Sequence, residues 1–477
     1  MPRRQPDPLA TTATPTATAR PEGPMGPTYR LVTIVLLAEV TMIAFETMAV
    51  STAMPAVAQD LDAVRNYGLV FAFMLSAQLF ASVVAGAWCE ARGPLAPMST
   101  GLALFGLGSV LAGAATTFPL LLAARVVAGL GGGLMVVSLY VAIGRAYPEV
   151  LRAKVFGWIS TAWVLPSVVG PVIAAWLTET LSWRWVFWCV VPGALVCLAL
   201  VLQRRAQFTT PRTVDRSADS VRRGRVAARK PVLLGLGVAL GAGIFQWASQ
   251  ELWPFAWLTW VATVLGLGVA LACARNLLPP GTFRMRRGLP SVMVSRFLFP
   301  GAWNGALAFV PLMVVQERGA SATVAGLMLC VGSIGWSVGA VLQGHESFAP
   351  HRDRLLSTGA ATLAAGLLLL AAVPLWDLPE LVIPVAVAVM GLGIGLAMSV
   401  MSVLSLDLSP AKEHGRVSAA LQLSDAFGAA VGIAITGALF AALHRGAGQD
   451  GAVYAGIWAG CALLAALAVV SGRRVRV

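Results

Sequence analysis

Two glycine-rich stretches decide the fold of this 477-residue chain: residues 129–134 read GLGGGL, and residues 391–396 read GLGIGL. They lie 262 positions apart, and the same offset pairs Pro148 with Pro410. Each stretch sits inside a long apolar segment and follows no strand pattern, so we interpret it as a surface for close helix packing and not as a phosphate-binding loop. The shared offset predicts that the second part of the chain repeats the first.

The composition around these stretches excludes a soluble globular protein. Of all residues, 58% are hydrophobic and 12% are charged, whereas an average soluble domain carries roughly 25% charged residues. Apolar runs of about 20 residues recur, which is the length that a helix needs to cross the hydrocarbon core of a bilayer. The runs are continuously apolar and do not alternate, so the spans are predicted to be helices and not strands of a barrel.

The apolar runs predict fourteen spans and a division of the chain into seven parts. The spans are expected at 31–57, 67–88, 95–115, 119–144, 155–177, 184–203, 231–249, 254–275, 289–316, 322–343, 355–374, 381–405, 416–443 and 452–471. The parts are a disordered cytosolic tail at 1–29, a six-helix bundle at 30–204, a basic cytosolic loop at 205–230, two additional spans at 231–275, a cytosolic loop at 276–288, a second six-helix bundle at 289–472 and a cytosolic tail at 473–477. The predicted fold class is therefore all-α integral membrane, with two six-helix bundles related by an internal repeat and two extra central helices.

Charge sets the predicted orientation of the spans. The formal net charge is +13, and Lys and Arg favour the cytosolic flanks of membrane spans. With both termini in the cytosol, the cytosolic segments hold 28 of the 34 basic residues, and the external loops hold Arg65, Arg184, Arg318 and Arg445. We therefore expect a multi-pass protein of the cell (inner) membrane, in which the basic excess needs no nucleic-acid partner. No cofactor and no metal are expected, because the six cysteines lack a C-x-x-C spacing and the four histidines lack a metal-ligand spacing.

Several short motifs lie in or beside the predicted spans. They are FETMAVSTAMP at 45–55, GAWCEARG at 86–93, RVVAGLGGG at 125–133, Gly170–Pro171, SWRWVF at 182–187, and Pro311, Gln316, Gly319 and 325–327 in the second bundle. Together they resemble the major facilitator superfamily, specifically its fourteen-helix branch of drug:proton antiporters, over most of residues 31–472. Glu90 stands where the family's loop motif has aspartate, and Pro166 stands where its antiporter motif has glycine. The resemblance implies gating or helix packing at Glu90, Gly129, Gly131, Gly133, Pro166, Gly170 and Pro171.

Three charged residues fall inside predicted spans of the first bundle: Glu39, Glu46 and Arg125. A charge at a helix centre costs on the order of 2.5 to 3.5 kcal/mol on insertion scales, so each one needs a partner or a function. Seven residues make about two helical turns, which places the two carboxyl groups on one face about 10 Å apart. In the family that the chain resembles, the arginine matching Arg125 is linked to proton movement at the first helix, which implies a pair with Glu46. We predict proton coupling at all three residues; the alternatives are a neutral glutamic acid bonded to a neighbouring helix and a purely structural pair.

The second bundle holds one further deep acid, Asp425, in the span at 416–443. Its partner in the repeat is Trp163, so the predicted site is asymmetric. We predict a coupling role for Asp425, with an intramembrane hydrogen-bonded pair as the alternative, and a substrate cavity at Trp163, Asn304 and Gln422. Arg296 lies nearer the cytosolic end of its span and is expected to extend to the membrane interface.

These features favour a secondary transporter that exports amphipathic or cationic small molecules in exchange for protons by alternating access. The alternative keeps the fold and exports an endogenous lipid or secondary metabolite, or imports a nutrient. A membrane enzyme or sensor would need a catalytic cluster or a soluble domain, and the sequence shows neither. The expected partners are a small-molecule substrate, protons and the lipid bilayer, and we expect a monomer.

Overall fold

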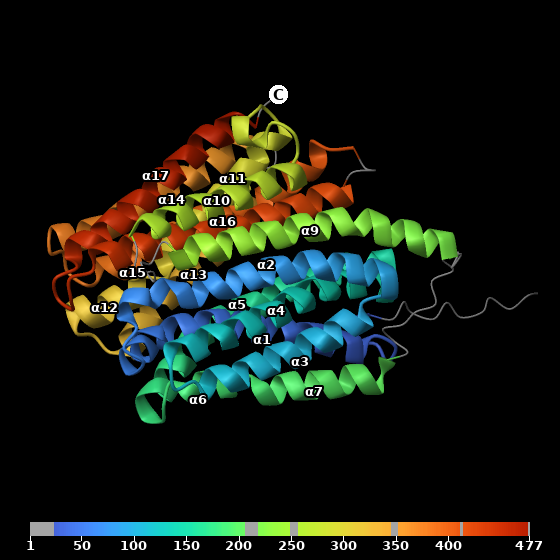
Figure 1. Ribbon diagram of the computed structural model, residues 1–477, viewed down its shortest axis with the longest axis horizontal. Coiled ribbons are helices and arrows are strands. Elements are labelled where there is room, and N and C mark those ends of the chain that lie inside the picture. Colours follow the sequence, from blue (N-terminus) through green and yellow to red (C-terminus); the bar gives the residue numbers. More distant parts are fainter. Residues whose placement is uncertain (1–22, 206–217, 249–255, 345–351, 411–413, 476–477) are drawn as a thin grey trace, which may run out of the picture.

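The computed structural model describes residues 23–205, 218–248, 256–344, 352–410 and 414–475, and the regular secondary structure of these residues is entirely helical (Figure 1). Most of the predicted tail at 1–29 and part of the predicted loop at 205–230 lie outside the described residues. The helices are α1 (Arg30–Asp60), η1 (Val64–Asn66), α2 (Tyr67–Arg92), α3 (Leu95–Gly113), α4 (Phe118–Ala146), α5 (Glu149–Thr180), α6 (Arg184–Trp188), α7 (Val191–Gln203), α9 (Ala218–Ala248), α10 (Ala256–Leu277), η2 (Thr282–Arg284), α11 (Leu289–Leu307), α12 (Val310–Arg318), α13 (Ala322–Gly344), α14 (Arg352–Leu375), α15 (Val382–Asp407), α16 (His414–Leu443) and α17 (Gly451–Arg473).

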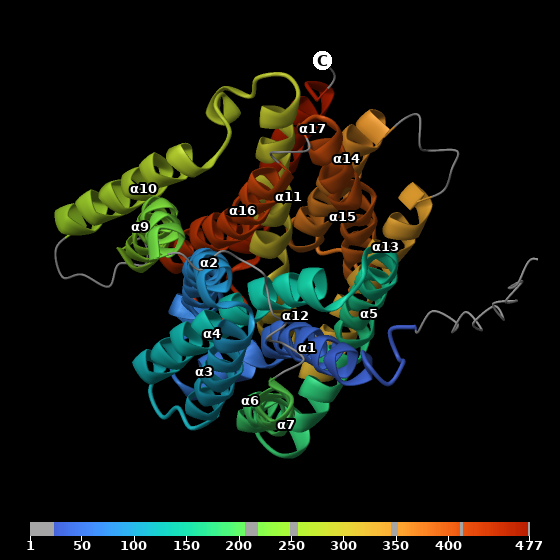
Figure 2. The same cartoon turned by 90° about the vertical axis from the view of Figure 1, so that its right-hand side faces the viewer.

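The helices form two groups, with a helical pair against their junction. Figure 2 shows α1 to α7 in blue to green and α11 to α17 in yellow to red. The pair consists of α9 and α10, and α9 also packs against α2 and α16. Gln246 of α9 is bonded to both groups, because its Nε2 donates to Ser76 Oγ in α2 (3.1 Å) and to the carbonyl oxygen of Ala430 in α16 (3.3 Å). The pair is therefore fixed to both groups and not only to one.

Among the described residues, twelve helices are long and apolar enough to cross a membrane. This confirms the prediction of an all-helical, multi-span protein. The twelve include α10 but not α5, and α9 contributes a shorter apolar stretch, Leu233–Ala248. The count of fourteen spans and the internal repeat therefore stay predictions.

Three boundaries differ from those predicted. The span at 184–203 is divided into α6 and α7, and the span at 289–316 is divided into α11 and α12. Pro192 and Pro311 stand in the first turns of α7 and α12, where the missing N–H is tolerated but continuation from the preceding helix is not. Helix α9 begins at Ala218, inside the segment predicted as a loop. From Ala218 onwards that segment is rich in Ala and Arg, which are strong helix formers, so the helix extends beyond the apolar stretch.

Glycines bring α4 into backbone contact with its neighbours. A Cβ atom on Gly133 would lie 2.2 Å from the carbonyl oxygen of Gln78 in α2, and Gly129 meets α2 in the same way. A Cβ atom on Gly131 would lie 2.3 Å from the backbone nitrogen of Phe105 in α3. Contacts of the same kind join α15 to α13 and α14 at Gly391, Gly393 and Gly395. Since side-chain atoms do not approach backbone this closely, these helix pairs need glycine.

Hydrogen bonds join the two groups near the end of α5. The carboxylate of Glu179 accepts the backbone N–H (3.0 Å) and the hydroxyl (2.8 Å) of Thr323 at the start of α13. The backbone N–H bond, followed by the hydroxyl bond, holds the pKa of the Glu179 carboxyl below its ordinary value. At the same end, Arg65 Nε donates to the carbonyl oxygen of Ala441 in α16 (2.9 Å). The two groups therefore touch at the end of the molecule that the charge pattern predicts to be external.

Candidate functional site

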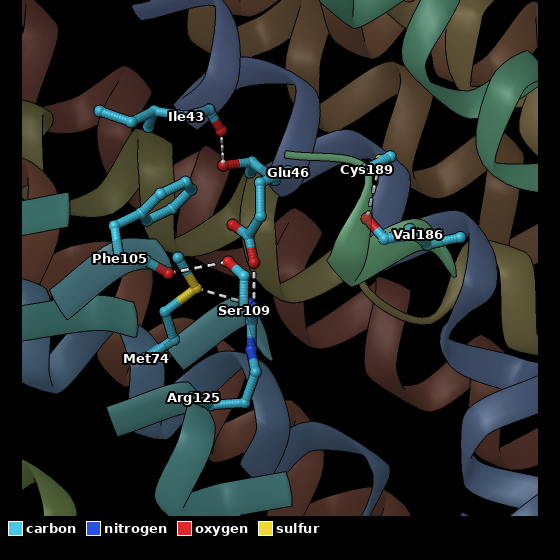
Figure 3. Close-up of polar contacts among 9 residues, drawn as sticks. Ile43, Glu46, Met74, Phe105, Ser109, Arg125, Val186 and Cys189 are labelled. Carbon is cyan, nitrogen blue, oxygen red and sulfur yellow. Dashed lines mark hydrogen bonds and ion pairs between the residues drawn. The ribbon is translucent and has the colours of Figure 1, made fainter. Parts of the chain in front are cut away.

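An ion pair between Glu46 of α1 and Arg125 of α4 lies in the interior of the first group (Figure 3). The side chains are 1% and 2% exposed. Arg125 Nη2 also donates to the sulfur of Met74 in α2, and its guanidinium lies 5.9 Å from the centre of the Phe187 ring in α6. The arginine is thus held by one anion, one soft acceptor and one aromatic face, all within an apolar environment.

The contact between the two charges is one-sided. Arg125 Nη1 donates to Glu46 Oε1, whereas Glu46 Oε2 and Arg125 Nε have no hydrogen-bond partner within the described part of the chain. A bidentate pair would engage both carboxylate oxygens. Here one oxygen stays available, so the carboxylate has a position at which a proton can bind without displacing the arginine.

Glu39 lies two turns before Glu46 in α1 and is fully buried. Neither of its carboxyl oxygens has a hydrogen-bond partner among the residues that the structure describes. An isolated buried carboxylate is costly, so this environment favours the neutral acid over the ion. The alternative to proton coupling, a neutral Glu39 bonded to a neighbouring helix, is therefore not seen among the described residues.

The second ion pair joins Asp425 of α16 to Arg296 of α11, with 3.5 Å between Oδ1 and Nε. Arg296 Nη1 also donates to the carbonyl oxygen of Met398 in α15 (3.0 Å). The arginine side chain is only 11% exposed. Arg296 therefore does not extend to the membrane interface as predicted, because Asp425 and the Met398 carbonyl provide acceptors inside the protein.

Helix α4 shows how far apart the two pairs lie. Arg125 is in the first third of this helix, whereas Tyr140, which interacts electrostatically with both Arg296 and Asp425, is in its last third. Fifteen residues of helix separate the two positions, which is about 22 Å along the axis. The two pairs therefore lie at different levels along α4.

The structure does not bring the three predicted cavity residues into one hydrogen-bonded cluster. Trp163 of α5 is 39% exposed and Gln422 of α16 is also exposed. The amide of Asn304 in α11 donates to the carbonyl oxygen of Pro300 in its own helix (2.9 Å). A shared cavity at these residues stays a prediction.

The residues assigned to gating or packing on α5 lie between α1 and α13. A Cβ atom on Gly170 would lie 3.5 Å from the Phe45 ring of α1. On the other side, a Cβ atom on Gly326 of α13 would lie 2.9 Å from the carbonyl oxygen of Pro171. Pro166 is buried. This part of α5 is thus in close contact with both groups.

The loop motif at 86–93 contains one contact that the sequence did not reveal. Glu90 is exposed, and Arg145 at the end of α4 donates to the carbonyl oxygen of Cys89 (2.9 Å). Gly93 has a φ of 86°, which glycine adopts without strain and which lets its N–H bond to the same carbonyl. The basic side chain therefore holds the C-terminal end of α2, as expected from the negative end of a helix dipole.

Within the described ranges, no group of three or more His, Cys, Asp or Glu side chains is placed to hold a metal ion. The site consists instead of charged pairs inside a bundle of apolar helices, where each charge is costly. Such a fold and site define the class of multi-span membrane transporters.

The chain belongs to the Major Facilitator Superfamily, whose model matches residues 36–279, 214–432 and 292–475. Members of this family are membrane transporters of small molecules and not enzymes.

Three relatives show the level of similarity. Multidrug transporter protein MdtP of Bacillus subtilis is 27% identical over 82% of this chain, and multidrug efflux pump SdrM of Staphylococcus aureus is 24% identical over 64% of it. An uncharacterized MFS-type transporter of Mycobacterium tuberculosis is 28% identical over 91% of it. The matches cover 71%, 66% and 63% of these relatives' own lengths, so part of each relative has no counterpart in the matched region.

Solved structures show the same fold at low identity. A D-xylose-proton symporter has a TM-score of 0.60 and 16% identity, and the match covers 91% of this chain and 96% of that one. A POT family transporter in complex with a thioalcohol-conjugated peptide has a TM-score of 0.66 and 14% identity, covering 92% and 95%. At these identities the likeness shows the fold alone.

Proposed function

We propose that this protein exports amphipathic or cationic small molecules in exchange for protons by alternating access. The observation that carries the proposal is the enclosed Glu46–Arg125 pair, in which one carboxylate oxygen has no partner among the described residues. When a proton binds this carboxylate, the attraction to Arg125 falls and the contact between α1 and α4 weakens. A proton site that controls a helix contact is what coupling requires.

The direction and the cargo rest on the relatives. MdtP is named a multidrug transporter, SdrM is named a multidrug efflux pump, and a third relative is named multidrug resistance protein 3. Glu46 and Asp425 are each paired with an arginine, so each pair is neutral overall and the preference for cationic or neutral cargo rests on the relatives. Export of such compounds is therefore the function that these observations support best.

The proposed membrane arrangement has fourteen spans, with both termini in the cytosol of a cell-membrane monomer. Helices α5 and α9, added to the twelve candidate spans, make up this number. The position of α9 and α10 beside the two groups suits two helices added to a pair of six-helix bundles. The matching glycine contacts of α4 and α15 support the proposed repeat.

The contacts near Glu179 and Arg65 support the alternating-access part of the proposal. They join the two groups at the predicted external end, as a conformation closed on that side would require. Export begins from such a state, in which cargo enters from the cytosol.

The experiment measures cargo-induced proton release from vesicles reconstituted with the purified protein under an imposed pH gradient. Glu46→Gln keeps the size and the hydrogen-bonding capacity of the side chain but cannot ionise, so we expect proton release to be lost while the protein stays folded. Glu46→Asp keeps the carboxyl group and should retain partial coupling. Asp377→Asn is the matched control, because Asp377 also pairs with an arginine, Arg318, but is 88% exposed; its coupling should equal that of the parent.

Parental proton release in Glu46→Gln would refute the assignment of Glu46. Glu39 and Asp425 would then be tested by the same substitution to the amide. Equal losses in Glu46→Gln and Asp377→Asn would mean that the assay reports general damage and not coupling.

A further inference from the structure

His444 follows directly after α16 and lies at the predicted external end of the molecule. Its Nδ1 donates a hydrogen bond to Asp450 Oδ2, and the other carboxylate oxygen of Asp450 accepts the backbone N–H of Arg445 (2.8 Å). The Asp450 side chain is fully buried, whereas that of His444 is 18% exposed. Histidine is the side chain whose charge ordinarily changes between pH 5 and 8, so this ring can exchange a proton with the solution.

Several charged groups beside His444 belong to the second group of helices. Asp450 begins α17 and Arg445 is the next residue in the chain. Glu317 of α12 holds the same loop, because its Oε1 accepts the backbone N–H groups of Gly448 (3.1 Å) and Asp450 (3.3 Å). These charges stay beside His444 if the two groups of helices separate, so they act on the imidazolium in either conformation.

Arg65 brings a positive charge from the first group to the same place. Its Nε donates to the carbonyl oxygen of Ala441 (2.9 Å) in the last turn of α16. Ala441 lies three residues before His444, which is about 4.5 Å along a helix axis. A protonated His444 would therefore meet the charge of Arg65 only while the two groups are in contact.

A series of aromatic rings also connects His444 to the first group. The ring of Phe440 stacks on that of His444, with 4.9 Å between the ring centres, and Phe309 follows at 5.2 Å from Phe440. Tyr67 of α2 lies 5.5 Å from Phe309, and Tyr454 of α17 lies 5.6 Å from Phe440. The two tyrosines are ordinarily uncharged below pH 8. Separation of Tyr67 from Phe309 would admit water to this series, and water stabilises an imidazolium better than an apolar contact does.

We propose that His444 is a proton site distinct from Glu46, and that a proton bound there favours opening of the external end. The inference rests on the proposed alternating access. Arg65 and the closed ring series disfavour the imidazolium in the conformation described here, and neither does so once the groups are apart. A ligand shifts an equilibrium toward the conformation that binds it better, so acid opens the side from which protons enter during export.

The test is the distance between two nitroxide labels on the purified full chain in nanodiscs, measured by double electron–electron resonance in a cysteine-free background. The labels replace Leu181, at the end of α5, and Leu381, just before α15, which are 59% and 76% exposed. These positions belong to different groups at the predicted external end, so opening lengthens the distance between them. From about pH 8 to about pH 5.5 the ratio of long to short distances should rise on the order of threefold in the parent.

Variants of the site separate charge from packing. His444→Asn keeps an amide nitrogen that can donate to Asp450 but cannot take up a proton, so the rise should be lost. His444→Lys carries a fixed positive charge and should populate the long distance at both pH values. Arg65→Gln removes the repulsion, so its rise should be smaller than that of the parent. His414→Asn is the matched control, because it changes a histidine at the opposite end of the same helix and should keep the parental rise.

A parental rise in His444→Asn would overturn the proposal, as would a parent in which acid does not increase the long distance. In a Glu46→Gln background the rise should persist and should again be lost on addition of His444→Asn. A rise that disappears in Glu46→Gln and persists in His444→Asn would assign the response to the coupling site and refute the role of His444. Absence of proton release from the parent in the vesicle assay, with the rise intact, would count against proton-driven export and not against His444.

Discussion

The two buried ion pairs differ in how completely the protein encloses them. Glu46 and Arg125 are 1% and 2% exposed, belong to one group of helices and share a hydrogen bond. Asp425 and Arg296 are 28% and 11% exposed, and they share only a longer contact of 3.5 Å. The two pairs are therefore expected to respond differently to the loss of one partner.

Removing the arginine of the enclosed pair should have the largest effect. In Arg125→Ala the carboxylate of Glu46 loses its counter-ion in an apolar interior, which costs about 3 to 5 kcal/mol. We expect a large fall in the thermal unfolding midpoint of the purified protein and a loss of transport. In Arg125→Lys the midpoint should fall less, because the counter-ion is kept; it should still fall somewhat, because lysine lacks the planar fork of arginine. A midpoint in Arg125→Ala equal to that of the parent would contradict the enclosure of this pair.

Double-mutant cycles should rank the two ion pairs by the coupling energy between their partners. The coupling energy between Asp425 and Arg296 is expected to be about 1 kcal/mol, since the pair is partly exposed and makes no direct hydrogen bond. The cycle for Glu46 and Arg125 should give a larger value. In each cycle the acid is replaced by its amide and the arginine by glutamine. Chemical denaturation in mixed micelles supplies the free energies of unfolding. Equal coupling energies in the two cycles would contradict the difference in enclosure between the two pairs.

The smallest effect is expected at an exposed carboxylate, Glu179, which joins the two groups. Its pKa is lowered in the folded protein, so its contribution to stability is complete above the ordinary glutamate pKa of about 4.3 and is lost as the pH falls through the lowered value. Glu179→Gln should therefore be slightly less stable than the parent at neutral pH and equal to it in strong acid. Thermal unfolding across this pH range provides the measurement. Glu380→Gln changes an exposed glutamate in the turn before α15 and is the control; a pH dependence in both variants alike would contradict the assignment to Glu179.

The sequence predicted the features that depend on hydrophobicity and on charge in apolar segments. Continuous apolar runs predicted helices. The cost of a lone charge in such a run predicted a partner for Arg125, and the family resemblance implied that this partner is Glu46, which the structure places against it. The same reasoning was wrong for Arg296, because its position near a span end offered two solutions. Extension to the interface and pairing with Asp425 are distinguished only by which helices are neighbours, and periodicity along one helix does not contain that information.

Other parts of the site depend on contacts between segments far apart in the chain. Arg145 bonds a backbone carbonyl at Cys89, and Glu179 bonds the start of α13 at Thr323. Neither residue has a motif that distinguishes it from an ordinary charge at a helix end. The break between α6 and α7 coincides with Pro192, but Pro55 and Pro166 lie inside unbroken helices, so a proline alone does not predict a break.

The backbone contacts of α4 bear on how this protein can change during evolution. Gly129, Gly131 and Gly133 leave no room for even one added carbon, so a substitution at any of them separates α4 from α2 or α3. Inherited substitutions that alter the range of transported compounds are therefore expected to be rare at these three glycines. They are expected to accumulate on the partly exposed faces of α5 and α16, around Trp163 and Gln422, where a new side chain meets open space.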